Sequence, residues 1–147
     1  MKITDALLGE HAVLYRLLDH GSRSLRSWKL PQVRAGGEML AAALLGHARL
    51  EDELLFTALE PQLPPRLGIL AAMREEHEQI EGTLVQLAEA KDVETARSLF
   101  AQTIDVSRLH FAKEEQVLFL LAARCLGVER LEELGRTWSG IAVPVPD

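Results

Sequence analysis

Residues 110–119 read HFAKEEQVLF, and the fold can be worked out from this stretch. Residues four apart in a helix project from nearly the same side, one turn apart, so His110 and Glu114 share a face. That face is otherwise apolar, with Val106 before the pair and Leu121 after it. An imidazole and a carboxylate therefore stand where leucine or isoleucine is expected, which indicates a buried polar site.

A second copy of this pattern lies earlier in the chain. Residues 47–56 read HARLEDELLF. The two segments share the histidine, a glutamate at the fourth place after it, an acid following that glutamate, and a closing Leu-Phe. Each segment therefore supplies half of a candidate metal site.

Two further segments also resemble each other, EHAVL around His11 and EHEQI around His77. The offset from His11 to His77 is 66 residues, and the offset from His47 to His110 is 63 residues. This internal repeat predicts two helical hairpins packed about a pseudo-twofold axis. Such packing would bring the four histidines to a similar depth.

Apolar residues at helical spacing predict helices, and no sustained alternation or hairpin turn predicts a strand. Thr4 is the expected N-cap of the first helix and Asp92 that of the fourth. The first helix is expected over residues 5–20. The second is expected to end at 60 and to begin either at 31 or after Gly36-Gly37. The third is expected over 66–90, the fourth over 93–127, and a short fifth over 128–138. Short connectors between four long helices predict an all-α, antiparallel up-down-up-down bundle. The bundle domain would be 1–127, with 128–147 a short C-terminal helix and an extended tail, VPVPD at 143–147.

Composition narrows the class of protein. A chain of 147 residues suits a single domain, and its net charge of −6 argues against a nucleic-acid surface. No apolar run approaches the length of a membrane span, and the N-terminus lacks the layout of a secretory signal. The lone Cys125 can form no internal disulfide, which fits a cytoplasmic location. Nothing in the sequence indicates the oligomeric state.

Four histidines and two glutamates at one level of a bundle could close on one or two metal ions, because adjacent helix axes lie about 8–10 Å apart. Imidazole with carboxylate suits iron, manganese or zinc, and the absence of thiolate argues against a closed structural zinc site. Burying the glutamates without a cation would cost several kcal/mol each. The alternative is that the glutamates face solvent. The candidate ligands are His11, His47, Glu51, His77, His110 and Glu114, with Glu81 as a seventh that could equally lie on the polar face.

Residues beside the candidate ligands are not expected to bind a metal ion directly. Tyr15 is expected in the core or as a hydroxyl bonded to a ligand, and His20 is expected to be solvated. Trp28 and Trp138 could pack on each other or on a partner. The acids adjoining the ligands are expected to face outward as a solvated surface: Glu10, Asp52, Glu76 and Glu115.

The pattern His11, His47-x-x-x-Glu51, His77 and His110-x-x-x-Glu114, one group per helix, resembles the hemerythrin-like family, also called HHE cation-binding domains. The resemblance covers about residues 5–127. It implies a four-helix bundle holding a non-haem di-iron centre, with manganese or zinc less favoured. By this resemblance His11 and His47 would bind one iron, His77 and His110 the other, and Glu51 and Glu114 would bridge them.

The sequence departs from the oxygen-carrying hemerythrins on the third helix, where those proteins have a second histidine one turn from the first. Here the residues one turn from His77 are Met73 and Glu81. A ligand set with one imidazole fewer should favour the ferric state, which counts against reversible oxygen carriage. The resemblance then favours sensing, iron handling, or reaction with oxygen, peroxide or nitric oxide.

Three functions stay open from the sequence. The first is a binding protein that uses a di-iron site to bind or sense a small ligand or to store iron. The second is an enzyme on the same scaffold that reduces peroxide or nitric oxide, although no catalytic residue is predicted. The third is a metal-free helical interaction module. A ferritin-like site is disfavoured because no histidine follows an acid by three residues, and no His-Glu-x-x-His motif of zinc proteases occurs.

Overall fold

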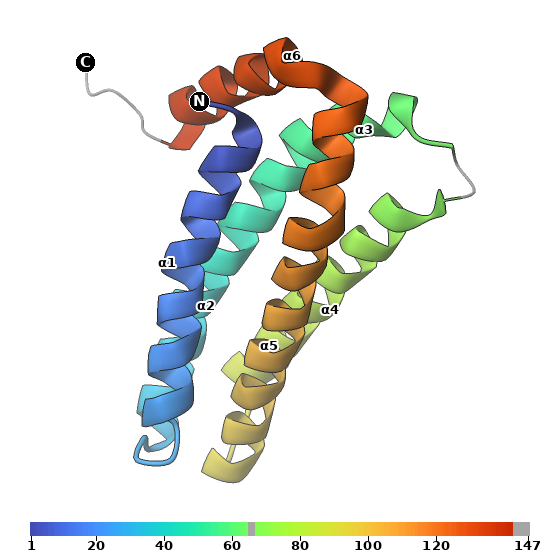
Figure 1. The fold of residues 1–147 in the computed structure, drawn as a ribbon. Helices are drawn as coiled ribbons and strands as arrows, with labels where there is room; N and C mark the ends of the chain where they lie inside the picture. The colour runs from blue at the N-terminus through green and yellow to red at the C-terminus, as the bar shows by residue number, and fades with distance from the viewer. Residues whose placement is uncertain (65–66, 143–147) are drawn as a thin grey trace.

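The computed structural model describes residues 1–64 and 67–142, and that part of the chain is helical with no strand. Figure 1 shows four long helices side by side: α1 (Ile3–Ser24), α2 (Leu30–Leu50), α4 (Ile69–Glu89) and α5 (Val93–Lys113). Short helical segments extend α2, namely η1 (Glu51–Phe56), α3 (Thr57–Leu59) and η2 (Glu60–Gln62). Likewise η4 (Glu114–Leu118) and α6 (Phe119–Ala142) extend α5. The predicted all-helical bundle is confirmed, whereas the predicted tail at 143–147 lies outside the described residues.

The helix starts differ in part from those predicted. The first helix begins at Ile3 because the Lys2 backbone N–H donates to Asp5 Oδ2 at 3.0 Å, and Thr4 is buried instead of capping. The second helix begins at Leu30, which decides between the two starts that the sequence leaves open. Asp92 does cap α5, since its Oδ1 accepts from the Thr95 backbone N–H at 2.8 Å.

The glycine pair inside α2 allows close packing and does not break the helix. A Cβ on Gly37 would lie 2.0 Å from Leu87 Cδ2, and a Cβ on Gly36 would lie 2.8 Å from the Trp28 ring. Helix α4 and the loop after α1 therefore approach the α2 backbone more closely than a side chain would permit.

The apolar core is divided into two clusters of buried residues. One contains Leu18, Val33 and Phe100 and fills the end of the bundle near the α1–α2 loop. The other contains Ile3, Leu55 and Leu131 and fills the opposite end, beneath α6. Buried histidines and glutamates lie between the two clusters. None of the helices in the described ranges has the length and apolarity required to span a bilayer.

Helix α6 bends at Gly127, which has a positive φ of 73° that favours glycine. The sequence predicts that the helix ends at this glycine and that a second helix reaches Trp138; the helical conformation in fact continues to Ala142. The part after the bend crosses the end of the bundle where α1 starts (Figure 1). There Gly135 lies so close to the N-terminus that a Cβ would come within 2.3 Å of the Met1 carbonyl oxygen.

We expect Gly135→Ala to destabilise the protein by about 1–3 kcal/mol, because the added methyl meets backbone atoms that cannot rotate away. Urea unfolding followed by circular dichroism would measure the change. Gly140→Ala in the same helix is the matched control, since no atom of the described residues lies within 4 Å of a Cβ there. The control should be neutral or slightly stabilising, and equal destabilisation by both variants would contradict the close-contact explanation.

Candidate metal centre

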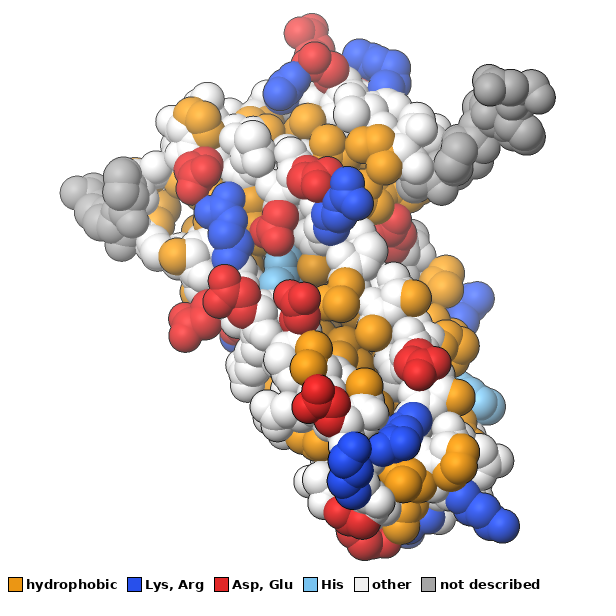
Figure 2. All heavy atoms as spheres, turned by 180° about the vertical axis from the view of Figure 1, so that it is seen from behind, with side chains coloured by type: hydrophobic (Ala, Val, Ile, Leu, Met, Phe, Trp, Pro, Cys, Tyr) orange, Lys and Arg blue, Asp and Glu red, His pale blue; other side chains and the backbone are white. Residues whose placement is uncertain are grey.

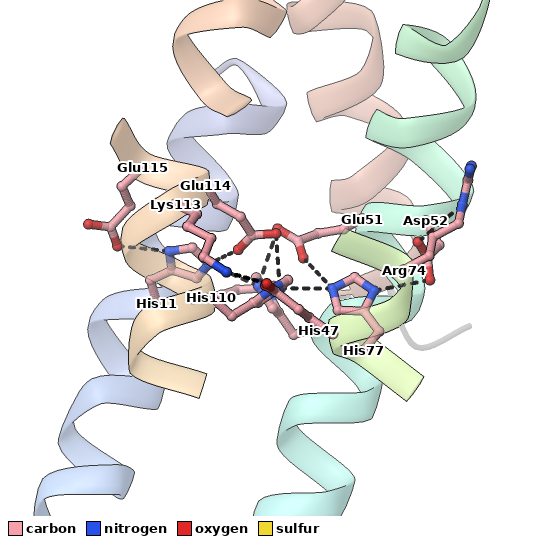
Figure 3. Close-up of polar contacts among 12 residues, drawn as sticks. His11, His47, Glu51, Asp52, Arg74, His77, His110, Lys113, Glu114 and Glu115 are labelled. Atoms are coloured by element: carbon pink, nitrogen blue, oxygen red, sulfur yellow. Dashed lines mark hydrogen bonds and ion pairs between the residues drawn. The ribbon is translucent and has the colours of Figure 1, made fainter. Parts of the chain in front are cut away.

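Six polar side chains converge in the layer between the two apolar clusters (Figure 3). Each of the four long helices supplies one histidine, and η1 and η4 each supply a glutamate as their first residue. The glutamates have no exposed surface, and the histidines are between 1 and 8 % exposed. The buried six are His11, His47, Glu51, His77, His110 and Glu114.

The side chains form two groups of donor atoms. In the His11/His47 half, the two Nε2 atoms are 3.0 Å apart. Here Glu114 Oε2 lies 3.2 Å from His11 Nε2, and Glu51 Oε1 lies 3.3 Å from His47 Nε2.

The His77/His110 half repeats this arrangement, with its two Nε2 atoms 2.9 Å apart. Here Glu51 Oε2 lies 3.5 Å from His77 Nε2, and Glu114 Oε1 lies 3.2 Å from His110 Nε2. Each glutamate therefore presents one oxygen to each half, which is the arrangement of a bridging carboxylate.

The spacing of the donor atoms and the lack of hydrogen bonds to the glutamates both fit bound cations. Two ligands held about 2.1 Å from one ion lie about 3.0 Å apart at right angles and about 3.4 Å apart at the tetrahedral angle. The spacings within each half, 2.9–3.5 Å, match that range. All four oxygens of Glu51 and Glu114 are buried and have no hydrogen-bond partner among the described residues. Buried carboxylate oxygens without donors are costly, and a cation between the imidazoles and carboxylates would remove that cost.

Both glutamates open a π-helical turn, at η1 and at η4. Each step of four residues along an α-helix drifts about 40° around the axis, so three such steps would leave the buried face. A π turn holds an additional residue and absorbs this drift, so that both the carboxylate and the apolar residues after it point inward. Buried positions accordingly recur every four residues in both helices: His47, Glu51, Leu55 and Leu59, then His110, Glu114, Leu118 and Ala122.

A carboxylate contacts the outer nitrogen of every histidine in the centre. His11 Nδ1 lies 2.9 Å from Glu115, His47 Nδ1 2.5 Å from Glu10, His77 Nδ1 3.2 Å from Asp52 and His110 Nδ1 2.8 Å from Glu76. These acids place the proton on Nδ1 and leave the Nε2 lone pair for an ion. The prediction that the four acids form a solvated outer surface is therefore wrong. Their recurrence at the ligands' offsets, 66 and 63 residues, was the signal in the sequence.

The acids in turn have their own partners. The Trp138 indole N–H donates to Glu10 Oε1 at 3.0 Å, Lys113 donates to Glu76, and Arg74 Nε lies 3.8 Å from Asp52 Oδ1. Burial, followed by the charge of Glu115 and a hydrogen bond to it, raises the pKa of the Tyr15 hydroxyl. Trp138 thus links the C-terminal part of α6 to the His11/His47 half, a role that the sequence does not reveal.

Proton binding reflects the concentration of negative charge in the centre. Burial lowers the pKa of His47, but the charge of Glu51 and the hydrogen bond to Glu10 outweigh burial and raise it to about 10. Burial raises the pKa of Glu51, but the charge of His47 holds it well below its usual range. The charges of His47 and Glu51 therefore offset each other in the metal-free core, and a bound ion would take the place of the proton on His47 Nε2.

The remaining candidates lie outside the two groups of donor atoms. Glu81 is exposed on α4 and belongs to neither group. Met73, one turn before His77, is buried in the apolar cluster beneath α6. His20 is exposed and lies near the Trp28 ring, which packs on Phe100, far from Trp138. The assignment of the six convergent residues and of Glu81 as metal ligands stays a prediction.

Along the described part of the chain, two wide surface grooves and a cavity of only about 10 Å³ beside His47, His77 and His110 reach the centre, and the two grooves differ in polarity. A groove of about 600 Å³ between α1 and α2 is lined mostly by apolar residues, and Glu10, His47 and Trp138 also line it. A groove of about 450 Å³ between α2 and α4 reaches His77 and is lined mostly by charged side chains: Arg49, Asp52, Glu53, Arg74, Glu78 and Glu81.

Comparison with protein families agrees with this geometry. A family model described as the hemerythrin HHE cation-binding domain matches residues 2–123. The match includes all six convergent side chains and stops before Gly127. No curated protein and no solved structure matches the chain. The family resemblance predicted from the His/Glu pattern is confirmed.

Proposed function

The chain belongs to the hemerythrin HHE cation-binding domain family, and from this premise we propose that it holds a carboxylate-bridged pair of iron ions in its core. His11 and His47 would hold one ion, His77 and His110 the other, and Glu51 and Glu114 would join them. The protein would use this centre to bind or sense a small ligand such as oxygen, nitric oxide or peroxide, or to handle iron.

The observation that carries the proposal is the pair of buried glutamates whose four oxygens lie 3.2–3.5 Å from imidazole nitrogens and make no hydrogen bond among the described residues. Apolar side chains would fill these positions at a lower free-energy cost, whereas a bound cation would compensate the buried carboxylates. The Nδ1 carboxylates support the same reading, because metal-binding histidines donate their outer N–H to such acceptors. When bound, the ions would supply Lewis acidity and one-electron redox chemistry.

The donor set favours binding of an outside molecule. Each half offers four protein donor atoms, which is two fewer than a six-coordinate ion takes. Imidazole with carboxylate oxygen also suits manganese and zinc, and we favour iron from the family. The reduction of peroxide or nitric oxide by the same centre is the alternative, and it would need an external electron source.

We also propose an up-down-up-down order for residues 1–127, since short loops at 25–29 and 90–92 join neighbouring helices. The helix after Gly127 would then pack on this domain as an addition to it. We place the protein in the cytoplasm, as its single cysteine suggests.

Metal analysis after anaerobic loading with ferrous ions tests the proposed function. We expect about two irons per chain, and on exposure to air an oxo-to-iron charge-transfer absorption in the near-ultraviolet. Parallel loading with manganese and zinc would rank the three metals. Protein that holds only trace metal after loading would rule out the proposal.

A further inference from the structure

The two halves of the centre have the same kinds of ligand atom. They differ in what lies next to the orienting acids, the carboxylates that contact the histidine Nδ1 atoms. In the His11/His47 half, Glu10 accepts from the neutral Trp138 indole at 3.0 Å, and Glu115 has no Lys or Arg partner among the described residues. In the His77/His110 half the neighbours are cations: Lys113 pairs with Glu76, and Arg74, which is hydrogen-bonded to Glu60, lies 3.8 Å from Asp52. Among the described residues, Lys or Arg side chains thus flank the acids of the second half but not those of the first.

This difference changes how strongly each half attracts a cation. An acid that is already paired with a cation lends less negative potential to the imidazole that it orients. The effect is moderate, because Arg74 is 36 % and Lys113 52 % exposed, and water screens both charges. The ion in the His77/His110 half is thus expected to be held several-fold less tightly.

The His77/His110 half is also the more accessible of the two to solvent. His77 is the most exposed of the four imidazoles, at 8 %, and it opens onto the polar groove between α2 and α4. Figure 2 shows a histidine in a hollow flanked by acidic and basic side chains on this face. Carboxylates in that groove, those of Glu53, Glu78 and Glu81, could replace the water around a departing ion.

The other half offers a poorer route for an ion. The His11 ring stacks on Phe111 and Phe119, with ring centroids 4.2 and 5.6 Å away. The groove that reaches His47 is mostly apolar, and a divalent cation shedding its water there would find few oxygen atoms.

From these two differences we infer that the His77/His110 half is the exchangeable half of the centre. It takes up its divalent cation last and releases it first, through the groove between α2 and α4, while the His11/His47 half retains its ion. This inference rests on the proposed two-ion function.

Release of ferrous ions to a coloured ferrous chelator, without oxygen, tests the inference. Wild-type protein should release its two irons in two phases of equal amplitude. Lys113→Met and Arg74→Met should each slow the fast phase roughly twofold to fivefold and leave the slow phase unchanged. Trp138→Phe keeps an aromatic ring but removes the neutral donor that holds Glu10 in place beside His47, so it should change the slow phase and leave the fast phase unchanged.

Arg49→Met is the matched control, because Arg49 lines the same groove but pairs with Glu53, which orients no ligand. Its release should match the wild type. Two irons that leave in a single phase, or cation variants that alter the slow phase, would overturn the inference and leave the proposed function standing. Fewer than two irons bound before chelation would instead count against the proposed function itself. All four variants change partly or fully exposed side chains, and their helical circular dichroism would be compared first.

Discussion

Replacement of both Glu51 and Glu114 by leucine is expected to abolish metal binding and, at the same time, to stabilise the metal-free protein by about 1–4 kcal/mol. Both carboxylates are fully buried, and their oxygens have no hydrogen-bond partner among the described residues. Leucine has a similar volume, and it would join the apolar clusters above and below the polar layer. Urea unfolding in the presence of a chelator, together with metal analysis after loading, would measure the two effects.

Glu81→Leu is the control for this prediction. Glu81 follows His77 by four residues, as Glu51 follows His47, but its side chain is exposed. The control should keep its full metal content and change stability by no more than about 0.5 kcal/mol. Loss of one ion in Glu81→Leu would show that the centre recruits this residue, and a double leucine variant less stable than the metal-free wild type would show that the buried glutamates are satisfied without an ion.

Loading the wild-type protein with its metal should raise its melting temperature by about 10 °C or more. An ion present at about 1,000 times its dissociation constant stabilises the folded state by about 4 kcal/mol for one site. In a domain of this size, 1 kcal/mol corresponds to about 2–4 °C. Thermal unfolding followed by circular dichroism, with and without ferrous ions under anaerobic conditions, would measure the shift.

The double leucine variant separates binding at the centre from binding elsewhere on the acidic surface. It should show no shift when loaded in the same way, because it lacks both bridging carboxylates. A wild-type melting temperature that does not respond to iron, manganese or zinc would favour the metal-free interaction module.

Sequence periodicity predicted the helices and the convergent side chains because a buried face repeats at a fixed interval. His47 with Glu51 and His110 with Glu114 interrupt that face in the same way twice, and this made the polar layer visible. The exposed position of Glu81 could not be predicted, because the spacing from His77 to Glu81 is the same as from His47 to Glu51. What distinguishes them is the packing around each helix, which leaves Glu51 with no exposed surface and Glu81 exposed on α4.

The orienting acids were misassigned for a related reason. Glu10 lies beside His11 in the chain but contacts His47 on the neighbouring helix, so its role depends on how helices pack and not on local spacing. The contact between Trp138 and Glu10 spans 128 residues and depends on the bend at Gly127. Such long-range contacts leave no periodic signal in the sequence.

The polar layer between the two apolar clusters also bears on how the molecule opens. Without ions, the end around Phe100 and the end around Phe56 are joined through a layer of buried imidazoles and carboxyl groups. Each end could then fray independently, and amide hydrogens at the two ends would exchange with solvent at unrelated rates. Ions bound to all four helices would fasten the ends together, so that the slowest amides at both ends would exchange only in a single global unfolding event.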